Sequence, residues 1–170
     1  MSLDVISQTR LQDVMPALAA KITQMATMLE QEGITFRVVQ ALRSWQQQDV
    51  LYAQGRTAPG NIVTNCPGGM SYHNFGLAVD CVPSVNGSDM AYAPDWNAAH
   101  PAWKRMEAVG QSLGLDSGAT GRSFPDAPHF QITGRFPEGA PDDEVRQLFK
   151  DGGCRAVWAE LEGTPAPHTG

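Results

Sequence analysis

Residues 71–80 read Ser-Tyr-His-Asn-Phe-Gly-Leu-Ala-Val-Asp, and this stretch decides how the rest of the chain is interpreted. His73 and Asp80 stand seven positions apart, separated by a glycine and an apolar run. This spacing suits two metal ligands, the first on a bend and the second on the strand that follows. Zinc accepts both imidazole nitrogen and carboxylate oxygen. A catalytic zinc site usually has three protein ligands, so we expect another histidine or carboxylate elsewhere in the chain.

Residues 124–132, Phe-Pro-Asp-Ala-Pro-His-Phe-Gln-Ile, supply that candidate. His129 opens a short apolar run, and Asp126 stands three residues before it. Pro128 keeps the residue before it out of the helical region, so the segment is predicted to be extended or turned. We therefore predict His129 as the third ligand and Asp126 as a nearby base. The alternative is a chance spacing, in which Asp80 only caps a turn.

Together these residues resemble the zinc D-alanyl-D-alanine carboxypeptidase and dipeptidase family. The shared pattern is Ser-x-His-x-x-Gly-x-Ala-x-Asp followed later by Asp-x-x-His, and the likeness is closest to the L-alanyl-D-glutamate endopeptidases that serve as bacteriophage endolysins. Further blocks of the same family stand upstream: Leu42-Arg43-Ser44, Gln48, Leu51-Tyr52, Gly55-Arg56-Thr57, Pro59-Gly60 and Thr64. The resemblance covers roughly residues 30–135, and several ordered blocks are far more specific than one short pattern.

The resemblance implies a catalytic site with one Zn²⁺ ion held by His73, Asp80 and His129. It also implies that Asp126 takes a proton from the attacking water and passes it to the leaving amine. Arg43 is implied to bind the substrate carbonyl and stabilise the oxyanion that develops there. The alternative role for Arg43 is a surface salt bridge.

Three further residues are implied to bind substrate, namely Ser71, Gln48 and Tyr72. Gln48 falls one turn into a predicted helix after Arg43, so both could face one cleft. Ser71 has the alternative of a local hydrogen bond to the backbone, which is compatible with orienting the site.

Helices and strands segregate along the chain, which favours an α+β fold with a small antiparallel sheet flanked by helices. The resemblance implies the fold shared by hedgehog signalling domains and D,D-peptidases. Hydrophobic spacing and capping residues predict helices over residues 7–31, 44–54, 101–113 and 142–149, with a break at Gly152 and Gly153 before a last short helix over 156–161. A strand is predicted over residues 34–42, and His100 is predicted to cap a helix rather than to bind metal. Residues 115–122 depart from the tryptophan- and glycine-rich segment that the family usually carries.

The length of 170 residues predicts a single domain over residues 1–162, which the resemblance implies is catalytic, and the composition of residues 163–170 predicts a disordered tail. The formal charge of −6 and the pI near 5.1 argue against nucleic acid as a partner. No apolar stretch approaches the ~20 residues of a membrane span, so no membrane insertion is expected. Cys66, Cys81 and Cys154 are predicted to be reduced thiols, and on a strand Cys81 would point away from Asp80.

The resemblance implies a zinc peptidase that cuts the stem peptide of peptidoglycan between L-alanine and D-glutamate, and a monomer is the default expectation for such an enzyme. No secretory signal is recognised at the start of the chain, so by family analogy the protein is made in the host cytoplasm and reaches the wall after a holin opens the membrane. Two alternatives stay open. One is a D,D-carboxypeptidase acting on terminal D-alanine, and the other is a non-catalytic wall-binding domain stabilised by zinc.

Overall fold

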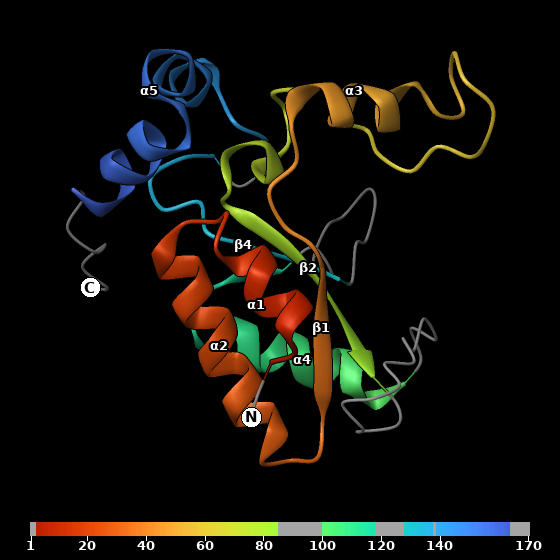
Figure 1. Cartoon of the computed structure of the whole chain (residues 1–170), viewed down its shortest axis with the longest axis vertical. Coiled ribbons are helices and arrows are strands. Elements are labelled where there is room, and N and C mark those ends of the chain that lie inside the picture. The colour runs from red at the N-terminus through yellow and green to blue at the C-terminus, as the bar shows by residue number, and fades with distance from the viewer. Residues whose placement is uncertain (1–2, 85–99, 118–127, 138, 164–170) are drawn as a thin grey trace. The chain divides into compact units, whose positions relative to one another are not determined.

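The structure is a computed structural model that describes residues 3–84, 100–117, 128–137 and 139–163 (Figure 1). The chain divides into two compact units, the first formed by Met1–Leu42 with Gly76–Ile132 and the second by Arg43–Phe75 with Thr133–Gly170. The single catalytic domain over 1–162 stays a prediction. The predicted tail lies outside the described residues from 164 onward.

The first unit contains a four-stranded antiparallel sheet and confirms the α+β prediction. In spatial order its strands are β1 (Thr35–Gln40), β2 (Ala78–Ser84), β4 (His129–Gln131) and β3 (Asp116–Ser117). Its helices are α1 (Val5–Leu11), α2 (Pro16–Glu30) and α4 (Pro101–Ser112). The predicted strand over 34–42 and helix over 101–113 are confirmed within two residues at each end, and His100 caps α4 by accepting a hydrogen bond from the Ala102 N–H.

The register of β2 and β4 decides which side chains share a face of the sheet. Asp80 is paired with His129, and Val79 is paired with Phe130. Because successive strand residues point to opposite faces, Val79 and Phe130 point together into the core, where both are fully buried. Asp80 and His129 therefore share the other face.

The single helix predicted over residues 7–31 is wrong, because the chain forms two helices, α1 and α2, with a break before Pro16. Proline has no N–H to continue a helix and holds the preceding residue out of the helical region. Met15 accordingly adopts φ −49° and ψ 129°. Its N–H donates instead to the Gly76 carbonyl at 2.9 Å, which joins the break to the stretch that leads into β2.

Helix α1 covers the outer edge of β1 (Figure 1). The Ser7 hydroxyl accepts a hydrogen bond from the Val38 N–H at 2.9 Å, and the Arg10 guanidinium donates to the Val38 carbonyl at 2.6 Å. Asp4 caps α1 through the Ser7 N–H and pairs with Arg37 on β1. The exposed backbone groups of an edge strand are a liability for aggregation, and α1 supplies partners for those of Val38.

The second unit contains α3 (Trp45–Ala53), the 3₁₀ helix η1 (Tyr72–Phe75) and α5 (Asp143–Glu162). Helix α3 confirms the prediction over 44–54, and Ser44 and Gln47 form a reciprocal capping box at its start. The predicted break at Gly152 and Gly153 is confirmed by their non-helical backbone angles, although the helix resumes at once and runs to Glu162.

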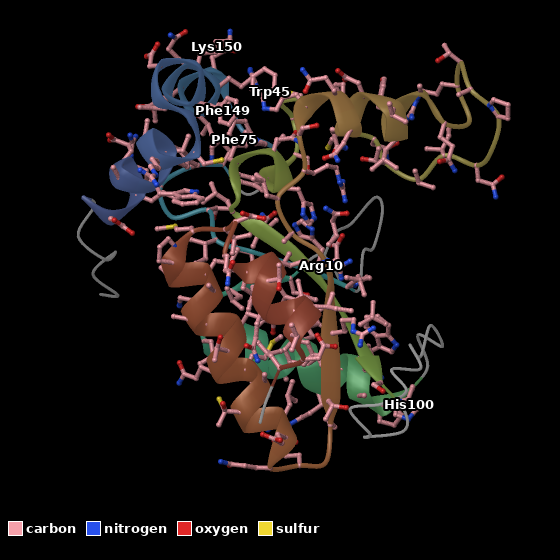
Figure 2. The ribbon with its side chains drawn as sticks, in the orientation of Figure 1. Arg10, Trp45, Phe75, His100, Phe149 and Lys150 are labelled. Atoms are coloured by element: carbon pink, nitrogen blue, oxygen red, sulfur yellow. The ribbon has the colours of Figure 1, made fainter. Side chains whose placement is uncertain are left out.

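Phe75 belongs to an aromatic cluster with Trp45 and Phe149 in this unit (Figure 2). Phe149 stacks on Trp45 with ring centroids 5.2 Å apart and meets Phe75 edge-on at 5.4 Å. Beyond the kink, the Trp158 indole N–H donates to the Phe75 carbonyl at 2.7 Å. Both halves of α5 thus hold the end of η1, the element that carries His73.

Candidate active site

Asp80 and His129 face each other across the β2–β4 ladder. The Nδ1 atom of His129 lies 3.3 Å from Oδ1 of Asp80, and both side chains are largely but not fully buried. The register of β2 against β4 brings these two residues together. The contact explains how residues 49 positions apart in sequence can serve one site.

His73 lies in η1 and is buried, and its carbonyl accepts a hydrogen bond from the Arg43 N–H at 3.0 Å. His73, Asp80 and His129 each offer one ligand atom, and these three atoms lie within 4.8 Å of one another. They form a group that could hold a metal ion.

The donor set fits a zinc ion, and so does the one distance between Asp80 and His129. Two imidazoles and a carboxylate are ligands found in catalytic zinc sites that leave a fourth position for water. Ligand atoms about 2.0–2.2 Å from a tetrahedral ion lie about 3.4 Å from one another. The 3.3 Å between His129 and Asp80 matches that edge.

Arg43 is fixed at its backbone and at its side chain. Its N–H donates to His73, and its carbonyl accepts from the Asn74 side-chain amide at 2.9 Å. Its guanidinium donates to Oε1 of Gln48 at 2.8 Å.

Gln48 is fully buried, and its amide is used within the second unit. Beyond accepting from Arg43, it donates from Nε2 to the Cys66 carbonyl at 2.8 Å and to the Thr64 hydroxyl at 3.2 Å. The geometry places Gln48 between Arg43 and the loop that follows α3. Its predicted contact with substrate is not tested by these bonds.

Ser71 and Tyr72 precede His73 directly. The Ser71 N–H donates to Oδ1 of Asn74 at 3.3 Å, and Ser71 is partly exposed. Tyr72 is buried, and its hydroxyl donates to the Pro137 carbonyl. Contacts of either residue with substrate stay predictions.

Asn74 is a positioning residue that the sequence interpretation missed. It is 1% exposed and uses both ends of its amide: Oδ1 accepts from Gly69 at 3.0 Å as well as from Ser71, and Nδ2 donates to Arg43 and Ser44. A short amide between His73 and Phe75 is a recognisable signal, because asparagine side chains hydrogen-bond to nearby backbone. Asn74 ties the loop before η1 to the residues before α3.

Comparison with known proteins identifies the chain's relatives. A family model described as VanY: D-alanyl-D-alanine carboxypeptidase matches residues 11–118. The chain belongs to this family.

Two named peptidoglycan endopeptidases are similar to this chain in sequence or in structure. The peptidoglycan L-alanyl-D-glutamate endopeptidase CwlK of Bacillus subtilis (strain 168) is 35% identical over 124 residues, which is 71% of this chain and 74% of CwlK. The crystal structure of the Serratia marcescens L-Ala D-Glu endopeptidase ChiX matches with a TM-score of 0.56 and 23% identity, covering 79% of this chain and 92% of ChiX. At that identity the ChiX likeness shows the fold, which confirms the expected peptidase fold.

Asp126 lies outside the described residues, as does most of the divergent segment over 115–122. The structure therefore describes His129 but not the residue predicted to act as base. The VanY model also ends at residue 118, before either of them. Asp126 stays a prediction from sequence.

The three cysteines are free thiols, as predicted. Cys81 is fully buried on the core face of β2, opposite to Asp80, so it is not a ligand candidate. Burial raises the pKa of the Cys66 and Cys154 thiols, and burial together with the Asp80 charge raises the pKa of Cys81 well above its usual value. In the described part of the chain, no helix has the length and apolar character needed to cross a membrane.

Proposed function

We propose that this VanY-family enzyme is a zinc-dependent peptidase that cuts the peptidoglycan stem peptide between L-alanine and D-glutamate. The observation that carries the proposal is the group formed by His73, Asp80 and His129, whose ligand atoms lie within 4.8 Å of one another. The bond assignment follows the named activity of CwlK, which is 35% identical over most of the chain.

His73, Asp80 and His129 would hold one Zn²⁺ ion. When bound, zinc lowers the pKa of a water ligand to about 7 and polarises a carbonyl group. The partial burial of Asp80 and His129 lowers the local dielectric, which strengthens their hold on a cation compared with exposed ligands.

Arg43 is proposed to bind the scissile carbonyl and to stabilise the negative charge that develops on its oxygen. A guanidinium is always charged and presents donors in a fixed plane. Gln48 accepts one of these N–H groups, which limits the rotation of the side chain. We therefore propose that Gln48 acts on the substrate through Arg43, and that Ser71 and Tyr72 line the same site.

Asp126 is proposed as the general base that takes a proton from the attacking water and returns it to the leaving amine. Its support is the sequence, where it stands three residues before His129. Replacing Asp126 with alanine is expected to abolish cleavage and leave zinc content unchanged, as measured by metal analysis of the purified protein. Replacing His73 with alanine is expected to lower both.

A second candidate function is removal of the terminal D-alanine, because the matching family model carries the name of a D-alanyl-D-alanine carboxypeptidase. The two activities differ in product. An endopeptidase releases stems with a new amino-terminal D-glutamate, whereas a carboxypeptidase releases only free D-alanine.

The deciding experiment is mass spectrometry of purified peptidoglycan after digestion by the zinc-loaded protein, with and without a chelator. Chelator-sensitive release of stems that begin with D-glutamate is expected. Loss of D-alanine alone would replace the endopeptidase with the carboxypeptidase. No cleavage by a folded, zinc-loaded sample would favour the wall-binding alternative.

We also propose that the enzyme acts as a bacteriophage endolysin released by a holin, as the sequence resemblance implies. Its support is the motif pattern alone, since CwlK comes from a bacterium. Expression in a bacterial host is expected to cause lysis only when a holin is expressed with it, measured as a fall in culture turbidity. Lysis without a holin would contradict this route.

A further inference from the structure

Gln131 contacts the proposed ligand His129 on the side that faces away from Asp80. Its Oε1 atom lies 2.7 Å from Nε2 of His129, a short distance for a neutral pair. Gln131 is 8% exposed, so the contact is largely shielded from water. Neither the motif pattern nor the named relatives assign Gln131 a role.

The alternation of side chains along β4 places Gln131 beside His129. Residues two apart in a strand lie on one face, so Gln131 shares the face of His129 while Phe130 between them points into the core. Across the ladder, Gln131 is paired with Ala78 on β2.

The two ring nitrogens of His129 thus have different surroundings. Nε2 meets an amide oxygen, whereas Nδ1 lies 3.3 Å from the Asp80 carboxylate. A neutral imidazole carries one N–H and one lone pair, and a carbonyl oxygen can only accept. The N–H therefore belongs at Nε2, and the lone pair at Nδ1 is directed to the side of Asp80.

We propose that Gln131 is a positioning residue that holds His129 as its Nε2–H tautomer, with Nδ1 directed toward the ion that Asp80 also binds. This inference rests on the proposed function in that it takes His129 as a metal ligand. Without such an acceptor, the Asp80 carboxylate would favour the opposite tautomer, with the proton on Nδ1 where the ion must bind. By accepting a hydrogen bond from Nε2–H, Gln131 disfavours the Nδ1–H tautomer in the metal-free protein.

The matched variants are Gln131→Leu, which removes the acceptor, and Gln131→Glu, which keeps it. Metal ligands with a second partner on the other nitrogen typically lose about 10–100-fold in affinity when that partner is removed. We expect Gln131→Leu to weaken zinc binding by about 10–100-fold and Gln131→Glu to retain it within a few-fold, measured by competition with a chromogenic chelator. Gln40→Leu is the control, because Gln40 lies opposite Asp80 on β1 and donates to the Leu42 carbonyl.

The tautomer is measured separately, in the metal-free protein, from the nitrogen chemical shifts and proton couplings of His129 by NMR. The expected pattern is an Nε2–H imidazole in the wild type and a shift toward Nδ1–H in Gln131→Leu. A wild-type protein with the proton on Nδ1, or a folded Gln131→Leu variant that binds zinc as tightly as the wild type, would overturn the inference. If zinc binds and the tautomer is as expected but no stem peptide is cut, the peptidase proposal fails and this one stands.

Discussion

Arg43 shows how single hydrogen bonds connect the candidate site to its scaffold. Its backbone is bonded to His73 and Asn74, and its guanidinium is bonded to Gln48. Gln48 in turn is bonded to Cys66 in the loop after α3. A charged side chain held at both ends loses less conformational entropy when it binds a carbonyl group than a free arginine would.

Replacing Gln48 with leucine should slow catalysis without reducing zinc binding. The change removes the acceptor for Arg43 and leaves the part-buried Cys66 carbonyl without this donor, at a cost of about 1–3 kcal/mol in the free energy of unfolding. We expect the cleavage rate of the folded fraction to fall by about 10–100-fold, the range for partners that orient active-site groups. Stem-peptide cleavage at saturating zinc measures the rate.

Two other variants make that result interpretable. Gln48→Glu keeps the acceptor and is expected to recover most of the rate, whereas Gln46→Leu on the exposed side of α3 should match the wild type. If Gln48→Leu lowers stability and leaves the rate of folded enzyme intact, Gln48 has no part in positioning Arg43.

At this scale the motif residues were predictable and their partners were not. His73 and Asp80 stand in one short pattern, so local spacing identifies them. The contacts made by Gln48 and Gln131 depend on which groups the fold brings to an amide that can both donate and accept. Such partners become visible only with the tertiary structure.

The packing of α4 on β4 depends on a glycine. A Cβ atom on Gly110 would lie 2.6 Å from Cε1 of Phe130, whose side chain is fully buried and next to His129 in sequence. Real Cβ atoms essentially never approach so closely, so either the helix or the strand must shift.

Gly110→Ala should therefore destabilise the protein despite the better helix propensity of alanine. Alanine gains up to about 1 kcal/mol in a helix interior, whereas overpacking a core costs about 1–3 kcal/mol. We expect a net loss of about 1–2 kcal/mol in urea unfolding and weaker zinc binding, because β4 carries both Phe130 and His129. Gln111→Ala on the exposed side of α4 is the control. Unchanged stability would show that the ring of Phe130 can move aside at no cost.

The kink of α5 requires a glycine for its backbone conformation rather than for space. Gly153 adopts φ 66° and ψ −161°, a region that is essentially restricted to glycine, and no heavy atom lies within 4 Å of its would-be Cβ. Gly153→Ala is expected to cost about 1–3 kcal/mol from backbone strain alone, with a lowered Tm and altered tryptophan fluorescence from Trp158. Lys150→Ala, in the helix before the kink, should leave both unchanged. A Gly153→Ala variant as stable as the wild type would show that the kink can relax.

Among the elements, those with long periodic patterns were predictable. The helix over 7–31 was predicted too long because its apolar spacing continues across Pro16, and only the missing N–H of proline marks the break. The strands β3 and β4 contain two and three residues, which is too short for any alternation to appear. Strand β4 depends on its pairing with β2, and β3 depends on its pairing with β4.

The stability of the molecule as a whole should depend on Asp4 near neutral pH. Burial raises the pKa of Asp4, but hydrogen bonds from Ser7 and the ion pair with Arg37 outweigh it and hold the pKa below 3.8. A lowered folded pKa means that the contribution is complete above the unfolded pKa and is lost as pH falls through the folded value. Asp4 therefore stabilises the protein at pH 7 and ceases to do so in strong acid.

Asp4→Asn removes the charge and retains a good helix cap. We expect it to be about 1 kcal/mol less stable than the wild type at pH 7, in the range of an ion pair with favourable geometry. The difference should shrink as pH falls below 3.8, measured by urea unfolding at a series of pH values. Asp13→Asn at an exposed position is the control. A difference that persists unchanged in acid would assign the effect to the cap rather than to the charge.

At the scale of the whole molecule, the family and the α+β class could be predicted because ordered motifs and segregated elements appear directly in the chain. The order of the sheet could not, since β3 precedes β4 in sequence yet lies outside it. The division into two compact units also follows from contacts between distant segments, which no local pattern encodes.

The contacts that Phe149 and Trp158 of α5 make with Phe75 at the end of η1 affect when the site can form during synthesis of the protein. Trp158 follows Phe75 by 83 residues, so a ribosome must add nearly half of the chain after η1 before that hydrogen bond can form. Until then Phe75 lacks its contacts with Phe149 and Trp158, and the segment that carries His73 has nothing from α5 to hold it. A growing chain is therefore expected to acquire its peptide-cutting site only near the end of translation, so that synthesis and activation are separated in time.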